Sequence, residues 1–291
     1  MLKKFLLLMI ILSSTLLSGC SFLTMTFDLT TNSTVSTTLP TTINGTISLG
    51  DQEYSSFSLY HSGTYDIEDI DDYNETLLST RDLIRRSNVF IISKAYEYTK
   101  PYPWSTSTVL SIVGSSQGSG VIFKEDDEYY YALTNYHVLD AEADEFTYEI
   151  EAFGDSMSYD AELVVYDEAL DLAVLKFTKE SREEIHIIDY TTRLFTLFNP
   201  DELVLAVGNP LSLPNNVTFG EFKSMETISN AEFKVIYHDA PIHEGSSGGA
   251  LVDIDGNLLG LNTWGLTSSD EYSFAIPNYI IYMFLVNYGI I

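Results

Sequence analysis

From residue 88 onward, short runs rich in β-branched and aromatic residues alternate with turn clusters such as "GNP" and "DIDGN". Runs of this length and spacing are typical of antiparallel strands. The pattern predicts a first strand from residue 88, followed by strands over 120–123, 128–134, 146–153, 161–166, 172–177, 203–207, 217–222, 233–237, 250–254, 258–263 and 272–276. The expected fold class is therefore all-β, a sandwich or a barrel.

Two segments depart from this strand pattern. The last one, "PNYIIYMFLVNYGII", has the length of a helix and begins with a proline, a residue favoured in the first helical turn. Earlier in the chain, "ETLLSTRDLIRRS" has the spacing of a short amphipathic helix. We therefore expect a short helix on each side of the predicted strands.

The N-terminus has the pattern of an export signal. Lys3 and Lys4 precede an apolar run over 5–12 that is too short for a comfortable membrane span. The ending Leu-Ser-Gly-Cys resembles the bacterial lipobox, in which the cysteine is lipidated and becomes the first residue. We therefore expect a lipoprotein signal peptide at 1–19 and lipidation at Cys20; a plain secretory signal and an uncleaved membrane helix are the alternatives.

The segment after the signal is rich in Thr, Ser and Asn and then acidic, and we found no sustained period in it. It predicts a flexible, lipid-anchored stalk over 20–73 and a folded domain over 74–291. Because Cys20 is the only cysteine, the exported domain has none left for a disulfide. The expected location is the extracytoplasmic face of the cell membrane.

The charge of the chain excludes one class of partner. With 14 basic and 42 acidic residues the formal net charge is −28, so there is no cationic surface to displace counterions from nucleic acid phosphates. The 45% of apolar residues is ample for a buried core. We expect a globular protein that binds neither DNA nor RNA.

The segment "HEGSSGG" raises the question of whether a serine in it is a nucleophile or only part of a turn. Serine needs a base to take its proton and a carboxylate to orient that base. His137 follows a predicted strand, whereas His61 and His186 lie in polar segments without such a setting. Asp171, directly before an apolar strand, is the candidate carboxylate, and Asp167 in the same turn is its rival.

Six motifs in fixed order carry a family resemblance: "GSGVIF", "ALTNYHVL", "ALDLAVLKF", "LAVGNPLSL", "DAPIHEGSSGGALVDIDGNLLGLNT" and "FAIP". Together they resemble the trypsin-like serine proteases of the HtrA/DegP group over residues 87–280. The resemblance implies two six-stranded β-barrels of chymotrypsin type with the short helix at the C-terminus. It also implies a trypsin-like serine endopeptidase that needs no cofactor and acts on polypeptide substrates.

The family pattern Gly-x-Ser-Gly-Gly assigns the nucleophile to Ser247 and leaves Ser246 as the variable position. By the same resemblance His137 is the general base and acid, and Asp171 fixes its tautomer. The backbone N–H groups of Gly245 and Ser247 are then the expected oxyanion hole.

The resemblance also implies where a substrate binds. Thr263, Trp264 and Gly265 would pair with an extended peptide by β-addition. Ile242 would border the pocket for the side chain before the scissile bond, and Pro241 leaves that pocket without an acidic residue. A small or medium apolar side chain is the expected guest.

The sequence departs from its relatives in two respects. Ser246 stands where digestive-type relatives have an aspartate, so activation by a new N-terminus is not expected. The chain ends soon after "FAIP", and we expect no PDZ domain. The main alternative function is a non-catalytic, protease-like binding or adhesion lipoprotein.

Other kinds of site lack support in the sequence. His243 and Glu244 have no second histidine four residues on, so the zincin motif fails and no metal site is expected. The glycine-rich segment over 114–120 contains no lysine and leads into a strand, unlike a phosphate-binding loop, and we expect a flexible surface loop there.

Overall fold

The structure is a computed structural model, which describes the backbone of residues 41–49, 52–59 and 70–291, except 140–142, 156, 180–183, 196, 200, 211–214, 230 and 266–271. Side chains are described from residue 71 on, apart from these gaps and residues 264 and 265. The chain divides into two units, 1–37 and 38–291. The first unit lies outside the described residues, so the expected signal peptide and Cys20 do too.

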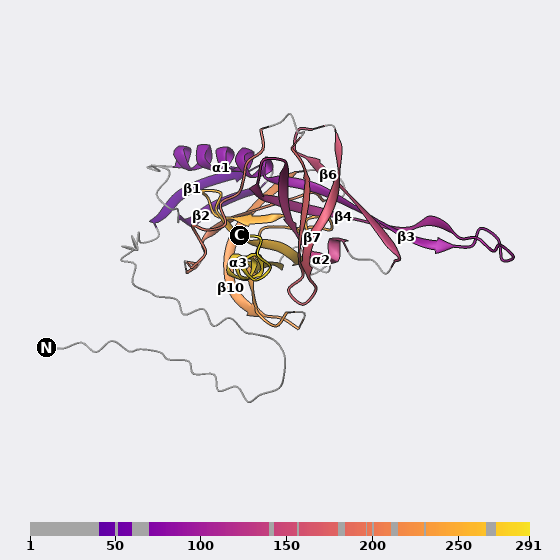
Figure 1. Cartoon of the computed structure of the whole chain (residues 1–291). Helices are drawn as coiled ribbons and strands as arrows, with labels where there is room; N and C mark the ends of the chain where they lie inside the picture. The colour runs from indigo at the N-terminus through magenta and orange to yellow at the C-terminus, as the bar shows by residue number, and fades with distance from the viewer. Residues whose placement is uncertain are drawn as a thin grey trace. The chain divides into compact units, whose positions relative to one another are not determined.

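Two closed antiparallel barrels, each of six strands, make up most of the second unit (Figure 1). The first barrel has the order β3-β4-β5-β8-β7-β6. Its strands are β3 (Asn88–Thr99), β4 (Val109–Glu125), β5 (Tyr129–Thr134), β6 (Glu145–Ala152), β7 (Ser158–Asp167) and β8 (Leu172–Thr178). A one-turn helix, α2 (Tyr136–Leu139), follows β5.

The second barrel has the order β10-β11-β14-β13-β12-β9. Its strands are β9 (Leu203–Gly208), β10 (Asn216–Thr227), β11 (Lys234–His238), β12 (Ala250–Val252), β13 (Leu258–Gly265) and β14 (Ser273–Pro277). Helix α3 (Asn278–Asn287) follows β14 directly, with Pro277 at its N-cap. These barrels and this helix confirm the expected all-β fold of chymotrypsin type.

The cores follow from the alternation of side chains along the strands. Residues that point into the first barrel, such as Val89, Ile91 and Leu175, form one fully buried cluster. A larger cluster joins side chains of both barrels to the apolar faces of helices α1 (Ile70–Arg85) and α3. This shared core fixes the two barrels against each other, which is the condition for a site built from both.

The expected stalk over 20–73 is wrong in part. Within it lie the hairpin β1 (Thr41–Leu49) and β2 (Gln52–Leu59), and α1 already begins at Ile70. The hairpin segments contain β-branched Thr and Ile residues, which favour strands. In α1, Tyr73, Leu77 and Ile84 form a buried stripe at helical spacing, so packing against the barrels stabilises a helix longer than its sequence pattern predicts.

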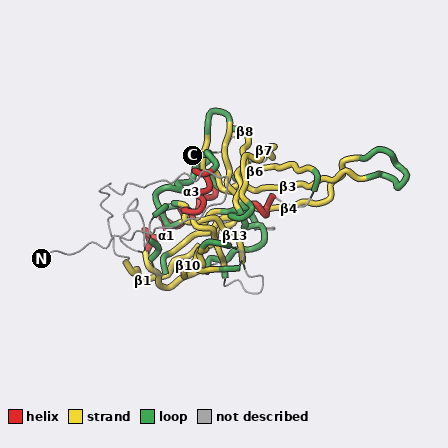
Figure 2. The backbone as a smooth tube through the Cα atoms, turned by 60° about the horizontal axis from the view of Figure 1, so that its bottom comes forward, coloured by secondary structure: helices red, strands yellow, loops and turns green. Residues whose placement is uncertain are grey.

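Strand β4 is also longer than its sequence pattern predicts. The expected strand covers 120–123, whereas β4 has 17 residues and pairs with β3 from Asn88↔Val121 to Thr99↔Val109. The far half of this hairpin extends beyond the barrel as a two-stranded ribbon (Figures 1 and 2). The expected flexible loop over 114–120 is therefore wrong: this serine- and glycine-rich segment is part of β4, because β3 pairs with it and supplies its hydrogen bonds.

A buried histidine makes the stability of this fold depend on pH. His238 on β11 is fully buried; burial lowers its pKa to about 4, although the charge of Asp239 opposes that shift. In the unfolded chain the pKa returns to about 6.5. As the pH falls from 6.5 towards 4, the unfolded state therefore takes up a proton that the folded state excludes.

We expect the free energy of unfolding to fall by roughly 2–3 kcal/mol between about pH 7.5 and about pH 4.5 because of His238 alone. Chemical denaturation at both pH values, on the wild type and on His238→Gln, measures it. The variant keeps all carboxylates and should lose less stability on acidification. Equal losses in the two proteins would contradict the prediction.

Candidate active site

The short helix α2 places His137 at the edge of the first barrel. Val138 and Leu139, its neighbours, are buried in the core of that barrel, while the His137 side chain is 45% exposed. The helix is thus held by its apolar residues, and His137 reaches outward from a rigid support. This agrees with the expected position just beyond a strand.

Asp171, not its rival Asp167, lies against the histidine. Its two carboxylate oxygens are 2.8 and 3.0 Å from His137 Nδ1, and it also accepts the His137 backbone N–H at 3.0 Å. Asp171 has a positive φ of 54°, and Asn135 donates to its carbonyl, so the turn is fixed in an uncommon conformation. Asp167 instead accepts from Leu170 N–H within the turn and from the Tyr288 hydroxyl.

Thr263 forms hydrogen bonds with both Asp171 and Ser247. Its hydroxyl donates to Asp171 at 2.9 Å, and its carbonyl accepts the Ser247 hydroxyl at 3.0 Å. The register of β13 against β14 shifts between Asn262 and Trp264, so Thr263 sits at an irregularity of the strand. Such a bulge redirects a residue out of the ladder. Here it turns Thr263 towards Asp171 and Ser247.

The two adjacent serines have different environments. Ser246 is buried, and its hydroxyl accepts the His243 backbone N–H at 3.3 Å. Ser247 is half-buried, with its hydroxyl on the side of Thr263. No hydrogen bond joins the described Ser247 and His137 side chains. The Ser247 hydroxyl donates to the Thr263 carbonyl instead.

The loop that holds these serines is attached to the first barrel through Ser119. The Ser119 hydroxyl donates to the Gly245 carbonyl at 2.7 Å, and its backbone N–H donates to the Ser247 carbonyl at 2.8 Å. The same hydroxyl accepts the Asn209 N–H at 2.8 Å. The Gly245 and Ser247 carbonyls therefore point into the protein. The backbone N–H groups of the same two residues have no acceptor among the described residues.

One edge of strand β13 is open beside the loop. β12 pairs with β13 at Leu258, Gly260 and Leu261 only, so residues 263–265 lack a neighbour on that side among the described strands. Their other side pairs with β14 through Trp264 and Gly265. Ile242 is half-buried against the core of the second barrel. An extended segment could pair with this open edge.

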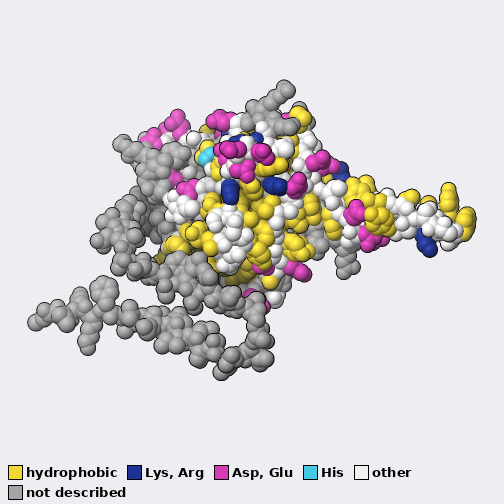
Figure 3. All heavy atoms as spheres, viewed as in Figure 1, with side chains coloured by type: hydrophobic (Ala, Val, Ile, Leu, Met, Phe, Trp, Pro, Cys, Tyr) yellow, Lys and Arg dark blue, Asp and Glu magenta, His cyan; other side chains and the backbone are white. Residues whose placement is uncertain are grey.

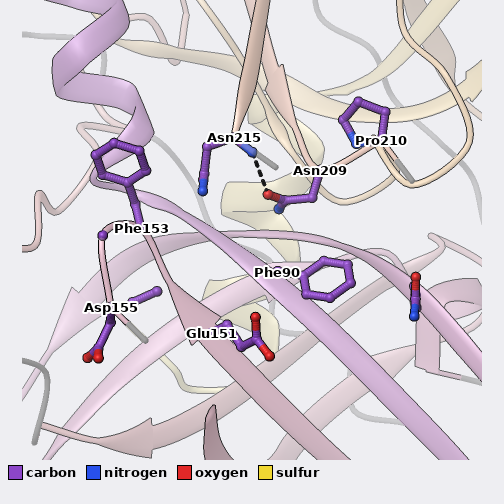
Figure 4. A pocket seen from close by; sticks show the side chains of 10 residues that line it. Phe90, Glu151, Phe153, Asp155, Asn209, Pro210 and Asn215 are labelled. Carbon is purple, nitrogen blue, oxygen red and sulfur yellow. Dashed lines mark hydrogen bonds between the residues drawn. The ribbon is translucent and has the colours of Figure 1, made fainter. Parts of the chain in front are cut away.

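A second feature near the loop is a cavity of about 520 Å³ (Figure 4). Its walls come from both barrels, and Asn209 and Pro210 of these walls are the residues that a Cβ at Gly245 would meet first. Asn209 accepts the Asn215 N–H at 2.8 Å (Figure 4). The cavity and Gly245 therefore share Asn209 and Pro210 as neighbours.

The arrangement brings a base, a carboxylate and a hydroxyl together. An Nδ1–H that is bonded to Asp171 leaves Nε2 of His137 as the free acceptor. In the described part of the chain, no group of three or more His, Cys, Asp or Glu could hold a metal ion. The candidate chemistry is thus that of an activated hydroxyl.

Comparison with known proteins gives this arrangement its context. Residues 118–261 match the trypsin-like peptidase domain. The matched region includes His137, Asp171 and Ser247.

Two relatives illustrate the similarity. The chain is 34% identical over 179 residues to serine protease HTRA1 of Xenopus tropicalis, a match that covers 60% of this chain and 36% of the relative. It is 32% identical over 191 residues to the serine protease Do-like HtrA of Lactococcus lactis. That match covers 60% of this chain and 45% of the relative. The chain therefore spans less than half the length of these relatives.

Solved structures agree with the sequence comparison. An HtrA-type protease with a decapeptide matches at a TM-score of 0.59 and 25% identity, covering 73% of this chain and 67% of that one. The serine endoprotease from Yersinia pestis matches at a TM-score of 0.53 and 28% identity, covering 74% of this chain and 66% of that one. The chain is thus similar in sequence and in fold to HtrA-type and other trypsin-like serine proteases.

Some residues that shape the site had no assigned role in the sequence. Ser119 and Asn209 lie in "GSGVIF" and "LAVGNPLSL", which mark the family resemblance but say nothing of a contact with "HEGSSGG". The hydroxyl of Thr263 is likewise an unexpected partner of Asp171. Only the approach of the two barrels brings these segments together.

Gly248 shows how tightly the loop is fitted, because a Cβ there would overlap the Ser119 carbonyl oxygen and the Thr134 hydroxyl. Its φ is also positive, at 84°. We expect Gly248→Ala to destabilise the fold by more than about 3 kcal/mol. Gly289 has a similar φ of 69° but nothing within 4 Å of a Cβ.

Gly289→Ala is therefore the matched control, and it should cost only about 1 kcal/mol for its backbone conformation. Denaturant unfolding of both variants measures the two effects. Equal losses of stability would show that contact with Ser119 is not what constrains Gly248.

Proposed function

We propose that the protein is a serine endopeptidase in which Ser247 is the nucleophile, His137 the general base and acid, and Asp171 the residue that orients the histidine. The observation that carries the proposal is the hydrogen-bonded His137–Asp171 pair beside the half-buried Ser247. Ser246 is not a candidate nucleophile, because its side chain is buried and bonded within its own loop.

In the proposed reaction Ser247 Oγ attacks the peptide carbonyl carbon while its proton moves to His137 Nε2. His137 then gives that proton to the leaving amine, and an acyl group remains on Ser247. Water, deprotonated by the same nitrogen, releases the acid and restores the hydroxyl. Asp171 accepts the hydrogen bond from Nδ1 throughout and stabilises the imidazolium.

The oxyanion of the intermediate would be stabilised by Gly245 N–H and Ser247 N–H. This assignment is supported by the loop geometry, since both carbonyls are bonded to Ser119 and both N–H groups lack an acceptor among the described residues. Each such donor is typically worth about 3 kcal/mol of transition-state stabilisation. The contacts of Ser119 lie next to both donors in the chain, so they hold the loop backbone in place when charge develops.

We infer that the substrate is a polypeptide. The open edge at residues 263–265 would pair with the acyl side of an extended chain, and Ile242 would border the side chain before the scissile bond. The leaving-group side would run towards the cavity beyond Gly245. A small ester would use neither feature.

One observation favours a second candidate, a non-catalytic binding or adhesion lipoprotein. The Ser247 hydroxyl is bonded to the Thr263 carbonyl and not to His137. In a free enzyme the hydrogen bond between the catalytic serine and histidine is often long and forms only with substrate. The missing bond therefore does not exclude the endopeptidase. The distinction is made by labelling.

Ser247→Ala should abolish labelling of the full chain by a fluorophosphonate probe, because no hydroxyl is left to react. It should also lower the cleavage of an unfolded, apolar-rich polypeptide by several orders of magnitude. Ser246→Ala, the matched control, should retain most of both signals. If the wild type is not labelled, the non-catalytic candidate is favoured; if Ser246→Ala is the inactive variant, the assignment of the nucleophile is wrong.

We further propose that the chain is exported, cleaved before Cys20 and held on the extracytoplasmic face of the membrane by lipid on that cysteine. The support is the N-terminal sequence alone, since these residues lie outside the described part. Among the described residues, no helix has the length and apolar character needed to cross a bilayer.

Cys20→Ser should prevent the full chain from incorporating labelled fatty acid when it is expressed in a bacterial host, because the acceptor sulfur is gone. Gel electrophoresis of metabolically labelled cells measures this directly. Unchanged incorporation in the variant, or none in the wild type, would contradict the lipid anchor.

A further inference from the structure

The distal part of the β3–β4 hairpin is an amphipathic ribbon. Paired residues of antiparallel strands share a face, and successive residues alternate between faces. Tyr96↔Ile112 and Tyr98↔Leu110 therefore lie on one face. The other face carries Glu97↔Ser111 and Thr99↔Val109, with the Thr99 hydroxyl bonded to that of Ser111 at 2.9 Å and Val109 as the one apolar member of these pairs. One face of the ribbon is thus apolar and the other mainly polar.

The apolar face has no cover within the described chain. Ile112 is 62% exposed, Tyr98 53% and Leu110 43%, although each would be expected in a core. Of the 18 large hydrophobic side chains that are exposed among the described residues, seven lie within 98–113. Figure 3 shows hydrophobic side chains gathered along this arm. Exposed hydrophobic side chains that gather on one element indicate an interaction surface, whereas single scattered ones do not.

The tip of the ribbon is aromatic and locally ordered. Trp104, at 80% exposure, stacks on Tyr102 with ring centroids 5.5 Å apart and an interplanar angle of 8°. Pro101 and Pro103 restrict the backbone between the strands, and Ser105 N–H donates to the Tyr102 carbonyl. The aromatic rings are therefore presented to solvent in a fixed arrangement.

The ribbon also differs from the rest of the chain in charge. Residues 98–113 contain Lys100 and no acidic residue, in a chain with 42 Asp and Glu. Acidic side chains begin at its base, where Glu97, Asp144 and Glu145 lie, the last two bonded to Tyr98. The negative charge that dominates the protein thus meets the apolar face only at its base, beside Tyr98.

We propose that this ribbon is a membrane-docking arm, which rests its apolar face on the interface of a lipid bilayer with Tyr102 and Trp104 at headgroup depth. Tyr and Trp are the side chains that favour this depth, because each has an apolar body and a polar group. An amphipathic element lies in the plane of the interface with its apolar face buried. The arm goes beyond the proposed proteolysis and does not depend on it.

A second copy of the chain fits the arm less well than a bilayer does. Two molecules that each carry a formal charge of −28 repel each other, whereas a zwitterionic lipid surface does not. A stable protein interface also needs about 800 Å² from each partner, which is demanding for one face of a two-stranded ribbon. Anionic lipids would repel the acidic body, so the arm should prefer zwitterionic ones.

The two tryptophans of the chain give a local test. In the full chain carrying Cys20→Ser, Trp264→Phe leaves Trp104 as the single reporter, and Trp104→Phe leaves Trp264 on β13 as the matched control. Each protein is mixed with phosphatidylcholine vesicles whose acyl chains are brominated. Trp104 should lose about half or more of its emission and shift to the blue, and Trp264 should change little.

Two further variants of the Trp104 reporter test the faces of the ribbon. Ile112→Glu puts a carboxylate on the apolar face and should reduce the quenching several-fold. Thr99→Glu adds the same charge on the polar face and should leave it nearly unchanged. Both sites lie outside the barrel, and circular dichroism checks that the fold is retained.

Three results would overturn the proposal. The first is an absence of Trp104 quenching, or quenching no greater than that of Trp264. The second is an equal effect of Ile112→Glu and Thr99→Glu. The third is a blue shift of Trp104 that rises with protein concentration without vesicles, together with a dimer in sedimentation velocity, which would assign the arm to a second copy.

Discussion

The contact between Ser119 of the first barrel and the 245–249 loop of the second is the constraint on which the site depends. One hydroxyl bonds both the Gly245 carbonyl and the Asn209 N–H, and the adjacent backbone bonds Ser247. This contact holds the Gly245 and Ser247 carbonyls inward, and the N–H groups of the same two residues have no acceptor among the described residues. Gly248 is required at the same place because the Ser119 carbonyl occupies the space of a side chain.

The remaining groups are held by supports of different kinds. His137 is fixed by the burial of the residues that follow it in α2, and Asp171 by a turn with positive φ. Thr263 joins Asp171 to Ser247 from an irregular position of β13. Since these supports belong to both barrels, the shared core that packs the barrels together also sets the distances within the site.

The same β3–β4 hairpin serves two purposes along its length. Near the barrel it supplies Ser119 to the site, and beyond the barrel it continues as the amphipathic ribbon with Trp104 at its tip. Proteolysis and membrane docking, as proposed, would therefore be connected through one continuous pair of strands. The lack of acidic residues in the ribbon would suit the proposed approach of this acidic protein to lipid.

The sequence by itself determined the all-β class, the C-terminal helix and the candidate residues, because strand periodicity and the motif around Ser247 are local features. It could not choose between Asp167 and Asp171 from the residues alone, since both occupy one turn and only the approach of α2 selects Asp171. It also missed the hairpin at 41–59, the length of β4 and the role of Ser119. Those features depend on partners distant in the chain, so only the tertiary structure decided them.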